Sequence, residues 1–308
     1  MTSRFRHPYL ILATVALLWG GNAIAGKLAV GHVSPMLLTL LRWTFACLFM
    51  APFALRDVRR EWPVIRRNLP FLFALGGLGF ATFNAIFYLA LNYTTAINVT
   101  IEQSAMPLIV LLANFLLFRM PVSSFQIVGF SLTLVGVVLT ASHGEPSALL
   151  ALDLNRGDAL MMIAVLLYGG YTVALRFKPV LNWRSTIFVL AASALVVSVP
   201  FAAAEWAMGD TRLPDGQGLS AALYTAIFPS LIAQSLYIRG VEMIGPNRAN
   251  LFINLVPIFG AILAVLVIGE TLRTYHIIAL AFVLGGIMLA ERGAAMRHRT
   301  PDTKTAPR

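Results

Sequence analysis

Two stretches of sequence align without a gap at a distance of 150 residues, FYLALNYTTAINVTIEQSAMPLIVLLANFLLFRMP (Phe87–Pro121) and YIRGVEMIGPNRANLFINLVPIFGAILAVLVIGET (Tyr237–Thr271). Pro107 in the first falls on Pro257 in the second, and each lies within a long apolar segment. A helix needs roughly 20 mostly apolar residues to cross a bilayer, and both segments reach that length. Self-similarity at a fixed period indicates an internal repeat. We therefore expect two similar membrane-embedded halves.

The composition extends this reading to the whole chain. It is 58% apolar and 12% charged, with a mean hydropathy of +0.79, whereas soluble domains average about 45–50% and about 25%. A soluble chain of 308 residues would need more charge to cover its surface. Segments of span length lie at about 8–27, 34–55, 69–91, 94–118, 122–142, 157–178, 185–206, 218–238, 246–268 and 274–291. The sequence predicts an all-α membrane protein with ten transmembrane helices.

These ten spans divide into a first five-helix repeat at 8–142 and a second at 157–291, followed by a polar, basic tail at 292–308 that we expect to be disordered and cytoplasmic. The run Trp19-Gly20-Gly21 falls on Tyr168-Gly169-Gly170, in keeping with the same division. Because five is odd, the second repeat enters the membrane from the opposite side, which makes the repeats inverted. Inverted repeats are typical of transporters that work by alternating access around a site near the middle of the bilayer.

Basic residues are distributed unevenly over the predicted loops. With a cytoplasmic N-terminus, the outside segments hold only Lys27, Arg156, Arg212 and Arg273, and nearly all the rest of the 23 lysines and arginines lie inside. This positive-inside bias predicts that both termini are cytoplasmic. The net charge of +10 is then a topology signal rather than a nucleic-acid surface. The expected partners are the lipid bilayer and a small-molecule substrate, with no nucleic acid, and the oligomeric state stays open, a monomer included.

Two ionisable side chains lie deep within the predicted spans, Arg42 and Glu102. Each is eight residues from the outer end of its span, which is about 12 Å at 1.5 Å per residue. A charge at that depth is costly unless it is paired, so we expect an Arg42–Glu102 ion pair. The pair could be a structural clamp, or Glu102 could titrate during transport or contact a substrate amine. The second repeat has Phe252 where the first has Glu102, which favours a functional role.

Prolines and amides mark the spans that we expect to move and to line a cavity. Pro107 and Pro257 cannot donate a backbone hydrogen bond and leave the carbonyls of Gln103 and Ile253 free, so both are predicted hinge or gating residues. The predicted substrate cavity is lined by Trp19, Asn22, Asn84, Tyr88, Asn98, Glu102, Gln103, Tyr168, Tyr171, Gln234, Tyr237, Asn250 and Asn254. Packing is the structural alternative for each aromatic residue in this set.

Several classes of site are missing from the sequence. The one cysteine, Cys47, lies within a span and permits no disulfide framework or cysteine metal site. Every histidine falls in a predicted loop, tail or span end, there is no phosphate-binding loop, and we expect no paired carboxylates within the membrane. We therefore predict no cofactor, no metal and no enzyme activity. A membrane enzyme or a scaffold is the alternative from another functional class.

The chain resembles the drug/metabolite transporter superfamily in its EamA-type ten-helix branch, over about residues 8–291. The resemblance rests on these motifs: Leu18-Trp19-Gly20-Gly21-Asn22, Arg42 after Leu40-Leu41, Tyr93-Thr94-Thr95-Ala96 with Ser104-Ala105-Met106-Pro107, and Gly269-Glu270-Thr271-Leu272 after Pro257. In the first repeat Phe118-Arg119 replaces the Gly-Glu that often ends this helix in the family. The family pattern often carries an arginine where Arg42 stands, whereas Glu102 departs from it.

The resemblance implies a bacterial inner-membrane carrier with a central cavity between the two repeats. Such carriers typically export amino acids or other small metabolites, and this chain is most similar to the amino-acid exporters, including those for aromatic and other apolar amino acids. A multidrug or nucleotide-sugar transporter is the alternative within transport.

Overall fold

The structure is a bundle of helices, and the predicted all-α membrane fold is confirmed. The computed structural model describes residues 7–145, 155–245, 248–249 and 251–297, with no strand among them. Ten helical segments are long and apolar enough to cross a membrane. They are Pro8–Ala29, Pro35–Arg67, Leu69–Ala90, Ala96–Phe118, Ser124–Ala141, Arg156–Phe177, Trp183–Ala207, Gly216–Ile244, Leu251–Ile268 and Thr274–Arg292. Most ends agree with the predicted spans to within a few residues.

Three helical segments run further than the sequence predicted, and one of them is the eighth span, which ends at Ile244 rather than at about 238. Helix α2 (Pro35–Arg67) has 33 residues, or about 50 Å at 1.5 Å per residue, against about 30 Å for the hydrocarbon core. The basic stretch from Arg56, predicted as a loop, is therefore the last part of α2, projecting beyond that core. Helix α15 (Thr274–Arg297) continues into the segment predicted as a tail, because nothing helix-breaking stands between Glu291 and Arg297 except Gly293.

Irregular turns interrupt the third, fourth, eighth and ninth spans, and another ends the sixth. Those of the third and fourth spans recur at corresponding places in the eighth and ninth, apart from the last turn of the ninth span, where the first half is α-helical. The third span is α3 (Leu69–Gly76), a π-helical turn η2 (Gly77–Thr82) and α4 (Phe83–Ala90), and the eighth is α11 (Gly216–Ile227), a π-helical turn η5 (Phe228–Ile232) and α12 (Ala233–Ile244). The fourth is α5 (Ala96–Glu102), a 3-10 turn η3 (Gln103–Ala105) and α6 (Met106–Phe118). The ninth combines a 3-10 turn η6 (Leu251–Leu255), α14 (Val256–Leu263) and a π-helical turn η7 (Ala264–Ile268). Such turns are frequent at functional sites in helices.

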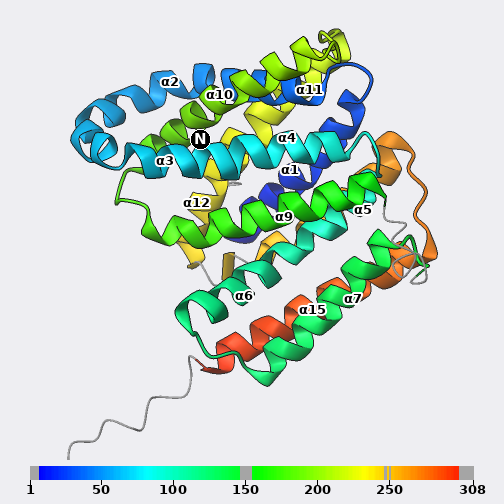
Figure 1. Ribbon diagram of the computed structural model, residues 1–308. Helices are drawn as coiled ribbons and strands as arrows, with labels where there is room; N and C mark the ends of the chain where they lie inside the picture. Colours follow the sequence, from blue (N-terminus) through cyan, green and yellow to red (C-terminus); the bar gives the residue numbers. More distant parts are fainter. Residues whose placement is uncertain (1–6, 146–154, 246–247, 250, 298–308) are drawn as a thin grey trace, which may run out of the picture.

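Helices from the two halves pack in pairs. Helix α7 (Ser124–Ala141) lies along α15, and α2 lies along α10 (Trp183–Ala207), at opposite ends of the molecule in Figure 1. Helix α1 (Pro8–Ala29) runs between them against α11, α12 and α14, and α9 (Arg156–Ala174, extended by η4, Leu175–Phe177) packs against α4 and α6. The α7–α15 contact is close because Gly129 and Gly286 each face the other's backbone, where a Cβ atom would clash with the facing carbonyl oxygen.

The α2–α10 pair is held by reciprocal capping. Glu205, near the end of α10, accepts hydrogen bonds from Ser34 Oγ at 2.5 Å and from the backbone N–H groups of Met36 and Leu37 at 3.1 Å. Glu61, near the end of α2, accepts from the N–H of Asn182 at 3.1 and 3.2 Å, just before α10 begins. Each carboxylate accepts hydrogen bonds from N–H groups that have no intrahelical partner at the start of a helix. Its negative charge is also stabilised there by the positive end of the helix dipole.

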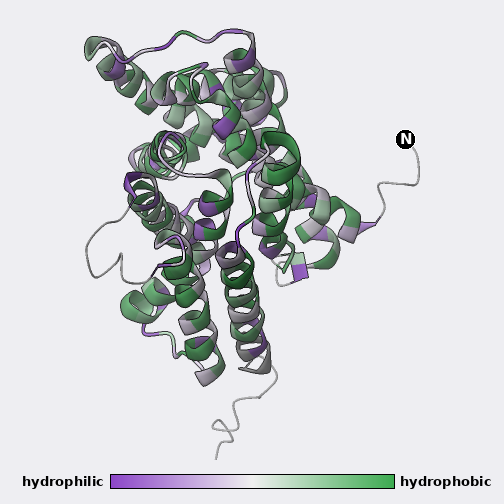
Figure 2. Cartoon of the chain, turned by 90° about the vertical axis from the view of Figure 1, so that its right-hand side faces the viewer, coloured by the Kyte–Doolittle hydropathy of each residue, from purple (hydrophilic) through white to green (hydrophobic). Residues whose placement is uncertain are grey.

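The outer surface is apolar, as a lipid-facing surface must be. Figure 2 shows that hydrophobic residues make up much of most helices. Large apolar side chains such as Leu117 (69% exposed) and Leu266 (76% exposed) point away from the bundle. Inside, one cluster of buried side chains surrounds Phe87 and Tyr88, and a second surrounds Trp43 and Leu72.

Candidate functional site

Arg42 lies in a buried polar cluster contributed by α1, α2, α4 and η5. Its Nη1 donates to Asn22 Oδ1 and Asn84 Oδ1, each at 2.8 Å, and also to the Tyr88 hydroxyl. Its Nε donates to Ser230 Oγ at 3.0 Å, which the π-helical turn η5 brings into reach. Arg42 is 6% exposed. Every one of these acceptors is neutral, so dipoles surround the guanidinium charge and, over the described part of the chain, no carboxylate neutralises it.

A chain of aromatic rings extends from the Arg42 cluster. The guanidinium carbon lies 5.1 Å from the centroid of Trp43, within the range of a cation–π contact. Trp43 stacks on Phe80 at 4.8 Å, Phe80 contacts Tyr171 at 5.6 Å, and Tyr171 contacts Tyr168 at 5.2 Å. Gly79 makes room for this arrangement, since a Cβ atom there would enter the Tyr171 ring. The structure thus brings an arginine and a run of aromatic rings from both halves together.

Trp19 and Tyr237 form a second aromatic pair next to the cluster. Their ring centroids are 5.3 Å apart. Trp19 Nε1 donates to the carbonyl of Pro229 at 3.2 Å, one residue before the Ser230 that binds Arg42. Of the predicted cavity residues, then, three contact Arg42 directly, and the aromatic members lie in contacts around the same cluster.

The predicted Arg42–Glu102 ion pair does not form. Arg42 is bound as above, and both carboxyl oxygens of Glu102 are buried with no hydrogen-bond partner among the described residues. The reason is packing, since α2 contacts α4, α10 and α11, whereas α5 contacts α1, α7, α9, α14 and α15. Equal depth along two helices does not place their side chains on facing sides.

Glu102 instead belongs to a second polar cluster with Asp158, at the start of α9. Glu102 is 0% exposed and Asp158 is 1% exposed. Glu102 lies one helical turn after Asn98 on α5, and Asn98 Nδ2 lies 3.4 Å from Asp158 Oδ1, so the two carboxyl groups share one buried site. Asp158 Oδ1 accepts from the Thr94 hydroxyl and, at 3.4 Å, from Asn98 Nδ2. Asp158 Oδ2 has no hydrogen-bond partner within the described chain. A buried carboxyl pair is therefore present, against the expectation of none.

Two histidines complete the second cluster. His143 Nε2 lies 3.6 Å from Asp158 Oδ2 and 3.3 Å from Asn98 Nδ2. His276, 2% exposed, accepts from the backbone N–H of Arg273 at Nδ1, so its Nε2 is the donor to Asn98 Oδ1 at 3.0 Å. The sequence placed these histidines at span ends, which is correct, and gave no sign that their side chains turn inward.

The helix breaks before the two prolines are present, whereas their role in gating is not tested by the structure. Pro107 and Pro257 each stand at the start of an α-helix directly after a 3-10 turn. Asn254, expected in the cavity, donates to Glu291 at 3.2 Å on α15. Gln103 and Gln234 are partly buried, and Asn250 lies outside the described residues.

Two charged residues have structural partners that sequence reasoning missed. Lys27 donates to the carbonyls of Leu91 at 2.8 Å and Thr94 at 2.7 Å, so it caps the end of α4. Glu270 accepts from the N–H groups of Ala96 at 2.8 Å and Ile97 at 3.0 Å, so it caps the start of α5. The Gly269-Glu270 motif thus stabilises the helix that carries Glu102.

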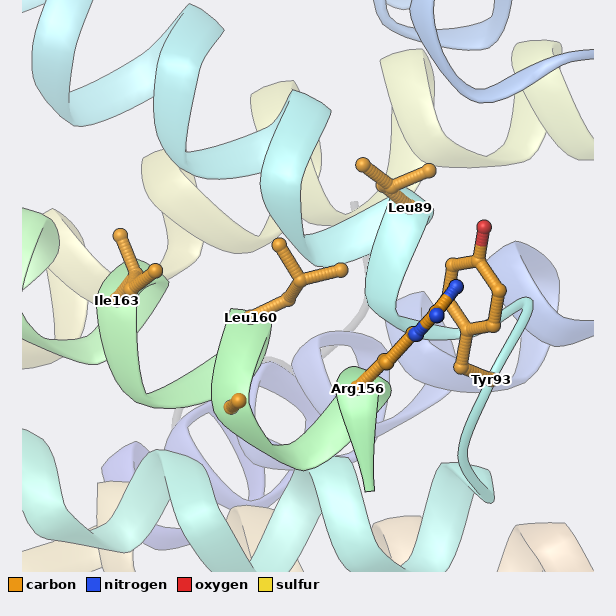
Figure 3. Close-up of a pocket in the computed structure, with 6 residues that line it drawn as sticks. Leu89, Tyr93, Arg156, Leu160 and Ile163 are labelled. Atoms are coloured by element: carbon orange, nitrogen blue, oxygen red, sulfur yellow. The ribbon is translucent and has the colours of Figure 1, made fainter. Parts of the chain in front are cut away.

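A shallow apolar groove runs between the third span and α9. One part of about 340 Å³ is lined by Leu89, Tyr93, Arg156, Ala159, Leu160 and Ile163. In Figure 3 the aliphatic side chains of α4 and α9 lie along it, with Tyr93 and Arg156 at one end. A second part of about 470 Å³ shares Ile163 and reaches Tyr171. Its lining is that of a lipid-facing surface, and neither polar cluster opens into it.

Comparison with known proteins agrees with this architecture. The model of the EamA-like transporter family matches residues 7–142 and again residues 155–291. The chain is 24% identical over 287 residues to the uncharacterized transporter YyaM of Bacillus subtilis, covering 92% of each protein. It is 22% identical over 309 residues to the uncharacterized inner membrane transporter YicL of Salmonella typhimurium, covering 96% of this chain and 98% of that one.

The fold is shared with a solved crystal structure. It superposes with a TM-score of 0.63 at 21% identity and covers 95% of this chain and 99% of that chain. The family model accounts for both halves, the relatives are similar over nearly their full length, and ten apolar helices are present. This chain is a multi-pass membrane protein that belongs to the EamA-like transporter family.

Proposed function

We propose that this chain is a secondary transporter that exports amino acids or similar small amphipathic metabolites by alternating access. The observation that carries the proposal is Arg42, a buried cation whose hydrogen bonds all go to neutral oxygens. An intramembrane ionisable residue is costly and marks a substrate path by default. A guanidinium forms its strongest hydrogen bonds with a carboxylate, so a substrate carboxylate would supply the neutralising charge that the protein does not.

The surroundings of Arg42 favour an apolar body on that substrate. Trp43, Tyr168 and Tyr171 offer flat apolar surfaces with polar edges, which suit an amino acid with an aromatic or aliphatic side chain. Asn22 and Asn84 could turn their amide oxygens toward a substrate amine once a carboxylate takes over Nη1. We infer that the substrate cavity opens between α1, α2, α4 and η5.

Alternating access is supported by the likeness of the two halves. The same family model matches each half, and the 3-10 and π-helical turns recur at corresponding places. The reciprocal capping of α2 by Glu205 and of α10 by Glu61 suits two halves related by a two-fold axis in the membrane plane. Pro107 and Pro257 would then be equivalent hinges.

The proposed location is the bacterial inner membrane, with both termini in the cytoplasm. The support is the bias of arginine and lysine toward the predicted inside loops. The basic end of α2, from Arg56 to Arg67, extends this bias into a helix that projects from the hydrocarbon core.

Two other substrate classes are weaker candidates within transport. An amphipathic cation, the usual multidrug substrate, would be repelled by Arg42 at the cluster. A nucleotide sugar carries a diphosphate, which calls for more cationic side chains than the single deep arginine provides. A membrane enzyme or scaffold has no supporting observation.

The test is flux from proteoliposomes loaded separately with labelled apolar amino acids, an amphipathic cation and a nucleotide sugar. We expect efflux of amino acids with apolar side chains, its loss in Arg42→Gln, and wild-type efflux in Arg184→Gln, whose arginine lies 3.9 Å from Asp57 in a surface ion pair. Amino-acid flux that is absent under all conditions, with flux of the cation or the nucleotide sugar present, would overturn the proposal.

A further inference from the structure

We propose that Glu102 and Asp158 form a proton-binding pair, loaded through His143, whose proton is exchanged for substrate during transport. The exchange rests on the proposed function, whereas the binding of the proton does not. Three side chains support the proposal. Glu102 is fully buried and its carboxyl has no hydrogen-bond donor, and Asp158 is a second buried carboxyl. The half-exposed imidazole of His143 lies 3.6 Å from Asp158.

A state with two charges is costly for this pair. Two adjacent carboxylates in a low-dielectric site repel each other, so the pair binds one proton more strongly than a lone carboxylate does. Asp158 Oδ1 accepts hydrogen bonds from Thr94 and Asn98, which favours the ionised form of Asp158. Glu102 has no donor to favour its ionised form. We therefore assign the proton to Glu102, whose O–H can donate to Asp158 because Asp158 Oδ2 has no hydrogen-bond partner among the described residues.

The pair has a route to water. The His143 side chain is 41% exposed, and it follows the end of α7 on the same face of the bundle as the start of α9. Its imidazole can take a proton from water and pass it to Asp158 Oδ2, after which Asp158 and Glu102 share it. The proton is released along the same path in the opposite direction, from the carboxyl pair through His143 to water. Under the proposed topology this face is outside, where a proton would enter in exchange for an exported substrate.

The remaining charged groups near α5 are already bound elsewhere. From α1, Lys27 donates to Leu91 and Thr94, and Glu270, just ahead of α15, caps the start of α5. From α15, His276 is fixed by hydrogen bonds with Arg273 and Asn98, and its ring centroid lies 4.1 Å from that of Tyr275. Helix α14 contributes no titratable residue. Asp158 and His143 are therefore the groups that can exchange a proton with Glu102.

The pair lies on other helices than the Arg42 cluster, next to a proposed hinge. Glu102 ends α5, directly before the 3-10 turn that leads to Pro107. A change in its charge would act on the turn that we propose as a hinge. Substrate at Arg42 and a proton at Glu102 would then bias the same movement from different helices.

The proton site is tested on the reconstituted full-length protein by infrared difference spectroscopy across a pH titration, which needs no substrate. We expect a C=O band of a protonated carboxyl that shifts in deuterium oxide, disappears at high pH, and is absent in Glu102→Gln. Asp158→Asn should move the midpoint of the titration, and Asp57→Asn, which removes the carboxyl that pairs with Arg60 and Arg184, should leave both the band and its midpoint unchanged. A Glu102→Gln spectrum identical to that of the wild type would overturn the proton site.

The exchange is tested separately in the proteoliposomes. We expect a pH gradient, acidic on the side opposite the substrate, to accelerate wild-type efflux several-fold and to leave Glu102→Gln unaffected, while substrate–substrate exchange persists in that variant and so reports a folded protein. Acceleration that survives in both Glu102→Gln and Asp158→Asn would overturn coupling. If no substrate moved at all, the proposed function would fail and the infrared result would still decide the proton site.

Discussion

At the scale of single residues, Arg42 is where the proposed substrate selection can be measured. Arg42→Lys keeps the charge but loses the planar fork that reaches Asn22, Asn84 and Ser230 together. One charge-assisted hydrogen bond contributes about 1.5–3 kcal/mol, so we expect the KM for a carboxylate substrate to rise roughly 10- to 100-fold. Initial efflux rates over a range of internal concentrations give this value. Arg184→Lys is the matched control, and an unchanged KM in Arg42→Lys would contradict the role.

The sequence predicts which side chains are deep but not what they touch. Arg42 and Glu102 are both buried, as their depth in the spans indicated. Their partners lie on helices distant in sequence, such as Ser230 and Asp158, and the rotation of each helix about its axis decides those contacts. Asp158 in particular stands in the first turn of α9, where an acid is explained by the helix dipole alone. No spacing rule distinguishes such an acid from one that meets Glu102.

At the scale of elements, two adjacent glycines of α15 should behave oppositely. A Cβ atom at Gly286 would clash with the carbonyl oxygen of Gly129 and with Thr133, whereas one at Gly285 meets nothing within 4 Å. We expect Gly286→Ala to lower the free energy of unfolding by about 1–3 kcal/mol, because the tightly packed α7–α15 pair must separate. Gly285→Ala should be neutral or stabilising by up to about 1 kcal/mol through helix propensity.

Thermal unfolding of the two variants in the same detergent measures this difference. Equal midpoints would mean that α7 and α15 do not pack as closely as their backbones indicate. The sequence does not distinguish these two adjacent glycines, and only Gly286 is a site of close helix approach. The spacing of residues in the sequence indicates which of them share a face of a helix. Which helix packs against that face depends on the packing of the whole bundle.

At the scale of the whole molecule, the architecture was the part that the sequence determined best. Apolar length predicted the ten spans, because a bilayer imposes nearly the same length on every crossing helix. The sequence predicted an interruption of a helix only where a proline removes a backbone hydrogen bond, as at Pro107 and Pro257. The turn η2 contains no proline and has two glycines, Gly77 and Gly79. It is held by long-range packing on Val197 and Tyr171, which no local pattern reports.

The proposed inverted arrangement predicts that equivalent loops lie on opposite sides of the membrane. Met120 and Leu272 stand in the corresponding loops after the fourth and ninth spans, 48% and 41% exposed. With Cys47, the one native cysteine, replaced by alanine, we expect Leu272→Cys to react with a membrane-impermeant maleimide in intact cells. Met120→Cys should react only after the membrane is permeabilised, because the repeat that carries it has the opposite orientation. Labelling of both cysteines from the same side would mean that the two halves run parallel, and alternating access around an in-plane axis would then have no structural basis.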